Sequence, residues 1–130
     1  LIETRVLLTE LRIRRPQARS ATAFESVGRS PRDRPIVCAA AHLTVEEGLP
    51  TSLRVAVGGV STEPVRLHKT EHLLPGKLLN RARIEEALAP SLDALTPIGD
   101  YRGSAEYRMA MARVLGRRAI LDAWERARRR

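Results

Sequence analysis

The chain has 130 residues, the length of one domain, and its 43% apolar and 29% charged residues are close to the usage of an ordinary globular protein. Its formal net charge is +8, and its one cysteine, Cys38, excludes a disulfide framework and fits a reducing, cytoplasmic compartment. No apolar run approaches the ~18 residues of a membrane span, and no apolar signal segment opens the sequence.

The first half of the chain shows strand patterns. Within residues 5–15, Leu11 and Ile13 alternate with Arg12 and Arg14, which predicts a half-buried strand that ends at Pro16. A short strand is predicted over residues 21–27, and the apolar run 36–45 is typical of a buried central strand. Residues 52–60 alternate again, so the five residues 46–50 are expected to form the turn of an antiparallel hairpin.

The second half shows helix patterns. A short helix is predicted over residues 65–74, stopped by Pro75-Gly76, and a second over 81–88, capped by Asn80 and ending before Pro90. Ser104 is expected to cap the longest helix. Its predicted buried stripe consists of Tyr107, Met111, Val114, Leu121 and Trp124.

Strands followed by helices predict an α+β fold. We expect an antiparallel sheet of three to four strands followed by about three helices packed on one face. Residues 1–130 then form a single domain, with strands at about 5–60 and helices at about 64–128. Because the sequence begins at Leu1 within an apolar-rich segment, we expect it to be a piece of a longer protein.

Two motifs could bind phosphate or metal, and each has a simpler interpretation. Gly58-Gly59 lacks the further glycines of a phosphate-binding loop, so a tight strand exit is favoured. His68 and His72 could share a helix face with Glu71 between them, but zinc needs three or four ligands, so a solvated helix face is expected.

Catalytic side chains are equally sparse. Cys38 and His42 share a face of one strand because their spacing is even, but no third group orients them, and a buried structural cysteine is expected. The pairs Glu46-Glu47 and Glu85-Glu86 are adjacent, so the two carboxylates of a pair do not face each other. The sequence therefore offers no self-contained active site.

The arginines suggest an alternative function. Residues 104–130 hold eight arginines against three acids, a net charge of +5, which leaves +3 for the rest. A free-standing basic module could bind an acidic protein or nucleic acid through Arg113, Arg117, Arg118 and the tail. Only four aromatic residues are present, so nucleic acid is the less favoured partner.

Three blocks of sequence resemble one family. They span residues 8–45, 53–66, which contain GGVSTEPVR, and 98–119, which contain DYRGSAEYR. Together these blocks resemble the C-terminal domain of the FAD-binding medium subunit of molybdenum hydroxylases, the carbon monoxide dehydrogenase and xanthine dehydrogenase flavoprotein family. The resemblance covers nearly the whole chain.

The resemblance implies a function for the parent enzyme. The subunit holds FAD, which relays electrons from iron–sulfur clusters on a small subunit, fed by a molybdenum cofactor on a large subunit, to an external acceptor. The FAD-binding domains lie upstream in the family and are expected to be absent from this chain. The domain is then a structural and flavin-covering part with subunit contacts, and is not catalytic alone.

The resemblance also implies that three residues, Leu8, Ser26 and Arg29, lie near the flavin. Leu8 occupies the place of an aliphatic side chain that approaches the flavin ring in the family. Ser26 and Arg29 belong to a segment of the type F-E-K-L-G-R-R, in which Ser26 and Ser30 stand where Lys and Arg are common. Asp33 is expected to pair with a neighbouring arginine.

The block from Asp100 to Arg108 has a structural interpretation of its own. Gly103 allows a tight chain entry and Ser104 caps the helix that follows. Tyr107 is expected to pack inward, and Asp100 or Glu106 to hold Arg102 or Arg108. A structural corner therefore explains the block without a catalytic role.

Overall fold

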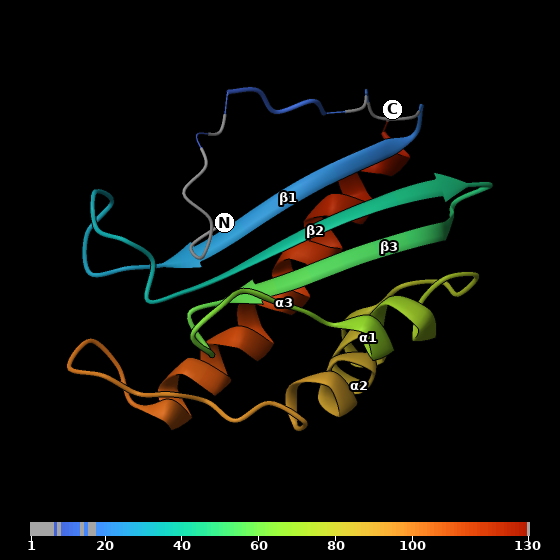
Figure 1. The fold of residues 1–130 in the computed structure, drawn as a ribbon. Helices are drawn as coiled ribbons and strands as arrows, with labels where there is room; N and C mark the ends of the chain where they lie inside the picture. Colours follow the sequence, from blue (N-terminus) through green and yellow to red (C-terminus); the bar gives the residue numbers. More distant parts are fainter. Residues whose placement is uncertain (1–6, 8, 14, 16–17, 130) are drawn as a thin grey trace.

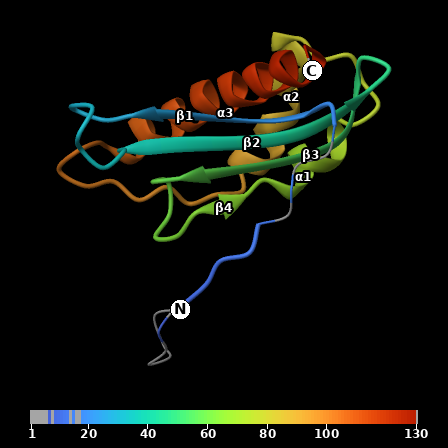
Figure 2. The same cartoon turned by 90° about the horizontal axis from the view of Figure 1, so that it is seen from above.

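A four-stranded antiparallel sheet forms one layer of the molecule. The computed structural model describes residues 7, 9–13, 15 and 18–129. The strands lie in the order β1-β2-β3-β4; Figure 1 labels the first three, and Figure 2 also labels β4. Their bounds are Ser20–Val27 for β1, Val37–Glu46 for β2, Leu49–Gly58 for β3 and Val65–Arg66 for β4. The expected sheet of three to four strands is confirmed.

Three helices form the second layer: α1 His68–Leu73, α2 Arg81–Leu92 and α3 Ala105–Arg128. Helix α3 crosses β1, β2 and β3, α2 packs against α3, and α1 packs against α2 and β3. Figure 2 shows α3 along one face of the sheet, while the described N-terminal residues leave on the other side. The predicted α+β arrangement is therefore confirmed. No helix in the described part of the chain is long and apolar enough to cross a membrane.

The two faces of β2 differ in burial. Val37, Ala39, Ala41 and Leu43 are buried in the core. On the other face of the strand, Cys38, Ala40 and His42 keep partial exposure. Cys38 belongs to this second face and is only half-buried, so the expectation of a buried cysteine is wrong. The apolar run that predicted burial on both sides contains small alanines, which leave the second face open.

The β2–β3 hairpin is tighter than predicted. Glu47 and Gly48 alone form the turn, and both have positive φ, 50° and 82°, as the two-residue hairpin turn requires. Strand β3 therefore begins at Leu49 and includes Pro50. The ladder is irregular between Thr44 and Val45, opposite Pro50, where a residue without an N–H is tolerated.

Two predicted elements are wrong. The described residues between 7 and 15 form no strand, and Leu11 and Ile13 are 72% and 82% exposed. Alternation alone did not make a strand there because these residues have no partner strand to complete a ladder. The helix predicted over 65–74 begins only at His68, because Val65 and Arg66 pair with the edge of β3.

Helix α2 runs further than predicted, through Pro90 to Leu92. Its end is held from outside the helix: the Thr70 hydroxyl donates to the Ala87 carbonyl at 2.9 Å, and the Thr70 N–H donates to Ser91 Oγ at 3.1 Å. These buried bonds offset the hydrogen bond that proline cannot donate. Asn80 caps the helix as expected, since its side chain accepts from the Arg83 N–H.

Helix α3 buries small residues rather than the predicted stripe. Ser104 caps it, accepting from the Tyr107 N–H at 3.2 Å. Of the predicted stripe only Trp124 is buried; Tyr107 is 39% exposed, so it does not pack inward. Small side chains let the helix lie close to the sheet. The buried face comprises Arg108, Ala112, Leu115, Gly116, Ala119, Ile120, Ala123, Trp124 and Ala127.

Arg108 joins the start of α3 to the ends of two strands. Its guanidinium, with the residue 3% exposed, donates to the carbonyls of Ile36 and Gly59, both at 2.7 Å, and to that of Gly103 at 3.1 Å. It also pairs with Asp100 at 2.5 Å. We call these five residues the Arg108 corner. It confirms the structural role expected for the block from Asp100 to Arg108.

Gly59 makes the corner possible. Its φ is +82°, and a Cβ at this position would lie 2.1 Å from the Ile36 carbonyl oxygen, an impossible contact. Only glycine therefore lets the exit of β3 reach the start of β2, which confirms the predicted tight strand exit. Both Ile36 and Gly59 then present carbonyls to the same arginine nitrogen.

Replacing Arg108 with methionine should lower the free energy of unfolding by about 3 kcal/mol, because buried carbonyls lose their donor. Urea unfolding measures the change. The matched control is Arg126→Met on the same helix, where the exposed pair with Asp122 is worth less than about 1 kcal/mol. Equal losses in the two variants would show that the corner does not stabilise the fold.

The stability of the corner should depend on pH through Asp100. The Arg102 N–H and the Arg108 guanidinium hydrogen-bond its carboxylate and lower the pKa from 3.8 to about 2. A lowered pKa gives stability that is present above pH ~4 and lost as the pH falls through about 2. The stability difference between wild type and Asp100→Asn should therefore shrink between pH 5 and pH 2, as followed by urea unfolding; a constant difference contradicts this.

Candidate functional site

The loop between β1 and β2 surrounds a polar hollow at one end of the sheet. Its volume is about 440 Å³. The Ile36 N–H donates to the Val27 carbonyl at 2.7 Å and closes the base of the loop. The hollow is lined by Ser26, Gly28, Arg29, Ser30, Pro31, Asp33 and Pro35. Ser26 and Arg29 thus line the same hollow. The family resemblance implies that both residues lie near the flavin.

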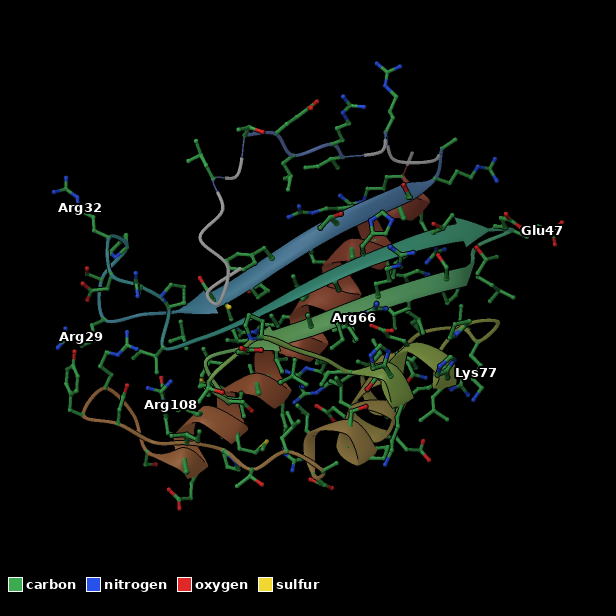
Figure 3. All side chains as sticks on the ribbon, viewed as in Figure 1. Arg29, Arg32, Glu47, Arg66, Lys77 and Arg108 are labelled. Carbon is green, nitrogen blue, oxygen red and sulfur yellow. The ribbon has the colours of Figure 1, made fainter. Side chains whose placement is uncertain are left out.

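An ion pair organises the loop. Arg29 Nε lies 3.6 Å from Asp33 Oδ2, which confirms the expected pairing of Asp33 with a neighbouring arginine. Both side chains stay exposed, so the guanidinium keeps donors for a further acceptor. The Asp33 N–H also donates to the Ser30 carbonyl at 3.2 Å. Figure 3 shows Arg29 and Arg108 at the same end of the molecule, with Glu47 at the other.

The Arg108 corner adjoins the end of this loop, because the two share Ile36. Ile36, whose N–H closes the loop, offers its carbonyl to Arg108. The start of α3 therefore fixes the chain at the point where the loop rejoins the sheet.

The open face of the sheet continues from the hollow. Ser26 stands opposite Cys38 in the β1–β2 register, and Phe24, on the same face of β1, is 59% exposed. Further along, a groove of about 910 Å³ separates this face from the described N-terminal residues. Its lining is rich in cations and hydroxyls: Leu11, Arg12, Ile13, Arg15, Thr22, His42, Thr44, Ser52, Leu53, Arg54 and Arg66.

The other candidate residues do not form a site in the described part of the chain. Leu8 lies outside the described residues. Cys38 and His42 share the open face, as their spacing predicted, but His42 Nδ1 lies 2.9 Å from Thr22 Oγ1. Within the described ranges no group of three His, Cys, Asp or Glu side chains could hold a metal ion.

Sequence reasoning missed the role of Glu71, a buried carboxylate. It accepts from the Val55 N–H at 3.0 Å and from Arg66, and it lies 3.3 Å from His68 Nδ1. Burial alone would raise the pKa of Glu71, but the bonds from Arg66 and Val55 outweigh burial and lower it. The residue ties α1 to β3 and β4. Its position between two histidines gave no sequence signal of this role.

The arginines of α3 are mostly neutralised within the chain. Arg113 pairs with Asp93 at 2.5 Å, Arg117 pairs with Glu85, and Arg126 pairs with Asp122. Arg128 stacks over Trp124, 4.8 Å from the ring centroid. This surface does not support the alternative of a free-standing basic module.

Comparison with known proteins identifies a family for this chain. The profile of the family described as CO dehydrogenase flavoprotein C-terminal domain matches residues 22–123. The chain is 32% identical over 126 residues to the carbon monoxide dehydrogenase medium chain of Afipia carboxidovorans, covering 97% of this chain and 44% of that protein. It is 37% identical over 76 residues to the nicotine 6-hydroxylase medium subunit of Paenarthrobacter nicotinovorans, covering 58% and 27%.

Solved structures agree. The reconstituted CO dehydrogenase from Oligotropha carboxidovorans has a chain that matches with a TM-score of 0.79 and 31% identity, over 85% of this chain and 39% of that one. Quinoline 2-oxidoreductase from Pseudomonas putida 86 matches with a TM-score of 0.78 and 27% identity, over 83% and 38%. The chain thus spans less than half the length of these relatives. It belongs to the CO dehydrogenase flavoprotein C-terminal domain family.

Proposed function

We propose that this chain covers the flavin in the FAD-containing medium subunit of a molybdenum hydroxylase. The observation that carries the proposal is the polar hollow of the β1–β2 loop, which gathers Ser26 and Arg29 in a chain of this family. Leu8 is proposed to complete the contact, on the family resemblance alone. The domain shapes the surroundings of the cofactor and does not catalyse a reaction by itself.

The residues of the hollow fit a contact with one part of FAD, but not its whole binding. Ser26, Arg29 and Ser30 offer hydroxyl and guanidinium donors that suit the polar edge of a flavin ring. The sequence contains no glycine-rich loop that could cradle the pyrophosphate. A bound flavin supplies the redox chemistry by accepting and passing on electrons; this chain supplies donors, a positive charge and a cover against water.

The proposal implies three partners for this chain. The N-terminal FAD-binding part of the same subunit would hold the cofactor. A small iron–sulfur subunit would deliver electrons, and a large subunit with the molybdenum cofactor would oxidise the substrate. The medium subunit would pass the electrons to an external acceptor in the cytoplasm.

The visible spectrum tests the assignment. The native complex purified through a tag on the protein that contains this chain should show flavin and iron–sulfur absorbance at moderate salt. The 130-residue chain by itself should not retain FAD through gel filtration, because it lacks a phosphate-binding loop. A colourless native complex, or tight stoichiometric FAD binding by these residues alone, would contradict the proposal.

We expect Arg29 to raise the midpoint potential of the flavin. In the native enzyme, Arg29→Gln removes a positive charge beside the cofactor, so reduction should become harder and the flavin midpoint potential should fall by roughly 20 mV, about 1 kcal/mol for two electrons. Spectroelectrochemical titration measures the potential.

The control for this shift is Arg32→Gln. Arg32 belongs to the same exposed loop and carries the same charge, but it is not among the residues that line the hollow. Figure 3 shows it at the tip of the loop. Its replacement should change the potential by less than a third as much. Equal shifts in both variants would mean that Arg29 acts only through net charge.

A further inference from the structure

A cleft opens between α2 and α3, on the helical layer of the molecule. Its volume is about 330 Å³. The walls are long charged side chains, and the floor is apolar. The cleft is lined by Arg81, Glu85, Leu88, Arg113, Val114 and Arg117. None of these residues belongs to the β1–β2 loop or to the open face of the sheet.

The charges in the cleft do not balance. Glu85 is its one acid, and the same oxygen of that carboxylate, Oε1, accepts from both Arg81 and Arg117. The lining therefore carries three guanidinium groups against one carboxylate, a net charge of +2. Asp93, which pairs with Arg113 from outside the lining, reduces this surplus to +1. A further anion would find guanidinium donors that are not fully used, since each group has five.

The arginines differ in how firmly they are held. The Arg117 side chain is 13% exposed, which keeps it in place in the cleft wall, whereas those of Arg113 and Arg81 are 45% and 73% exposed and can adjust. A fixed cation beside an adjustable one suits a planar carboxylate, which guanidinium binds through two parallel hydrogen bonds.

The floor of the cleft is built by close packing of the two helices. Leu88 is 1% exposed, and a Cβ at Gly116 would lie 3.4 Å from Leu88 Cδ2, so the side chain of Leu88 rests on the backbone of α3. Val114 completes the apolar surface. A cleft of this size is at the small end of ligand sites, which are about 300–1,000 Å³ with an apolar lining and a few converging polar groups.

We propose that this cleft binds a small organic carboxylate. The carboxylate lies against Arg113 and Arg117, and its apolar part packs on Val114, above the buried Leu88. The proposal is independent of the flavin-covering function, because the cleft shares no residue with the hollow of the β1–β2 loop.

Benzoate is the probe for this site. Titrated into the ¹⁵N-labelled 130-residue chain, it should shift the amides of residues 81–88 and 113–117 saturably, with a dissociation constant of about 1 mM. Benzamide, which keeps the ring without the charge, and acetate, which keeps the charge without the ring, should each bind at least tenfold more weakly. Both halves of the site are thereby tested.

Variants distinguish binding in the cleft from a general attraction of benzoate to a basic protein. Arg113→Gln should weaken benzoate binding about tenfold, and Arg117→Gln should do the same. Arg126→Gln, on the same helix but outside the cleft, should change it less than twofold. Thermal unfolding of each variant shows that it is folded.

Three results would overturn the proposal. The first is the absence of saturable shifts at 20-fold the expected dissociation constant. The second is equal binding of phosphate or acetate, with equal loss in Arg113→Gln and Arg126→Gln, which would indicate unspecific ion attraction. The third is tighter binding of a short acidic peptide than of benzoate, which would assign the cleft to a protein partner.

Discussion

The hydrogen bonds of one buried arginine hold the parts of this domain that its proposed function needs. Arg108 gathers three carbonyls and one carboxylate from three separate places in the sequence. Two of the carbonyls come from Ile36 and Gly59, which directly precede β2 and follow β3, and the arginine itself belongs to the first turn of α3. The long helix, the central strands and the β1–β2 loop are thereby placed relative to one another. Such a group is costly to bury unless every donor is used, so the corner tolerates little change.

This constraint divides the molecule into parts with different tasks. The helical layer packs small residues of α3 against the sheet, and several of its arginines are held in ion pairs. The loop at the end of the sheet keeps Arg29 exposed, and no helix among the described residues covers the open face of the sheet. A domain that covers a cofactor held by another part of its protein needs such an arrangement: a rigid back, and a polar edge free to make contacts. The cleft between α2 and α3 lies apart from that edge.

Much of the fold could be predicted from the sequence, and the errors have physical causes. The apolar patterns located β1, β2 and β3 approximately, and the caps Asn80 and Ser104 marked the starts of α2 and α3 correctly, because a cap acts locally. Periodicity failed at Leu11 and Ile13, where alternation lacked a partner strand, and along α3, where alanine and glycine bury well but give a weak hydrophobic signal. The helix end beyond Pro90 depends on Thr70, a tertiary contact that no local pattern shows. At the site, the resemblance placed Ser26 and Arg29 together, whereas the burial of Glu71 and the four-way role of Arg108 needed the structure.

Hydrogen exchange of the native protein tests most directly whether the β1–β2 loop faces the flavin. Amide exchange would be followed by mass spectrometry in the FAD-loaded protein and after removal of the flavin. The account predicts that peptides covering residues 24–35 exchange faster once FAD is removed, while those covering 105–128 are unchanged, because α3 is held by the core and not by the cofactor. Unchanged exchange in 24–35, or an equal increase in both segments, would contradict a flavin-covering role for this loop.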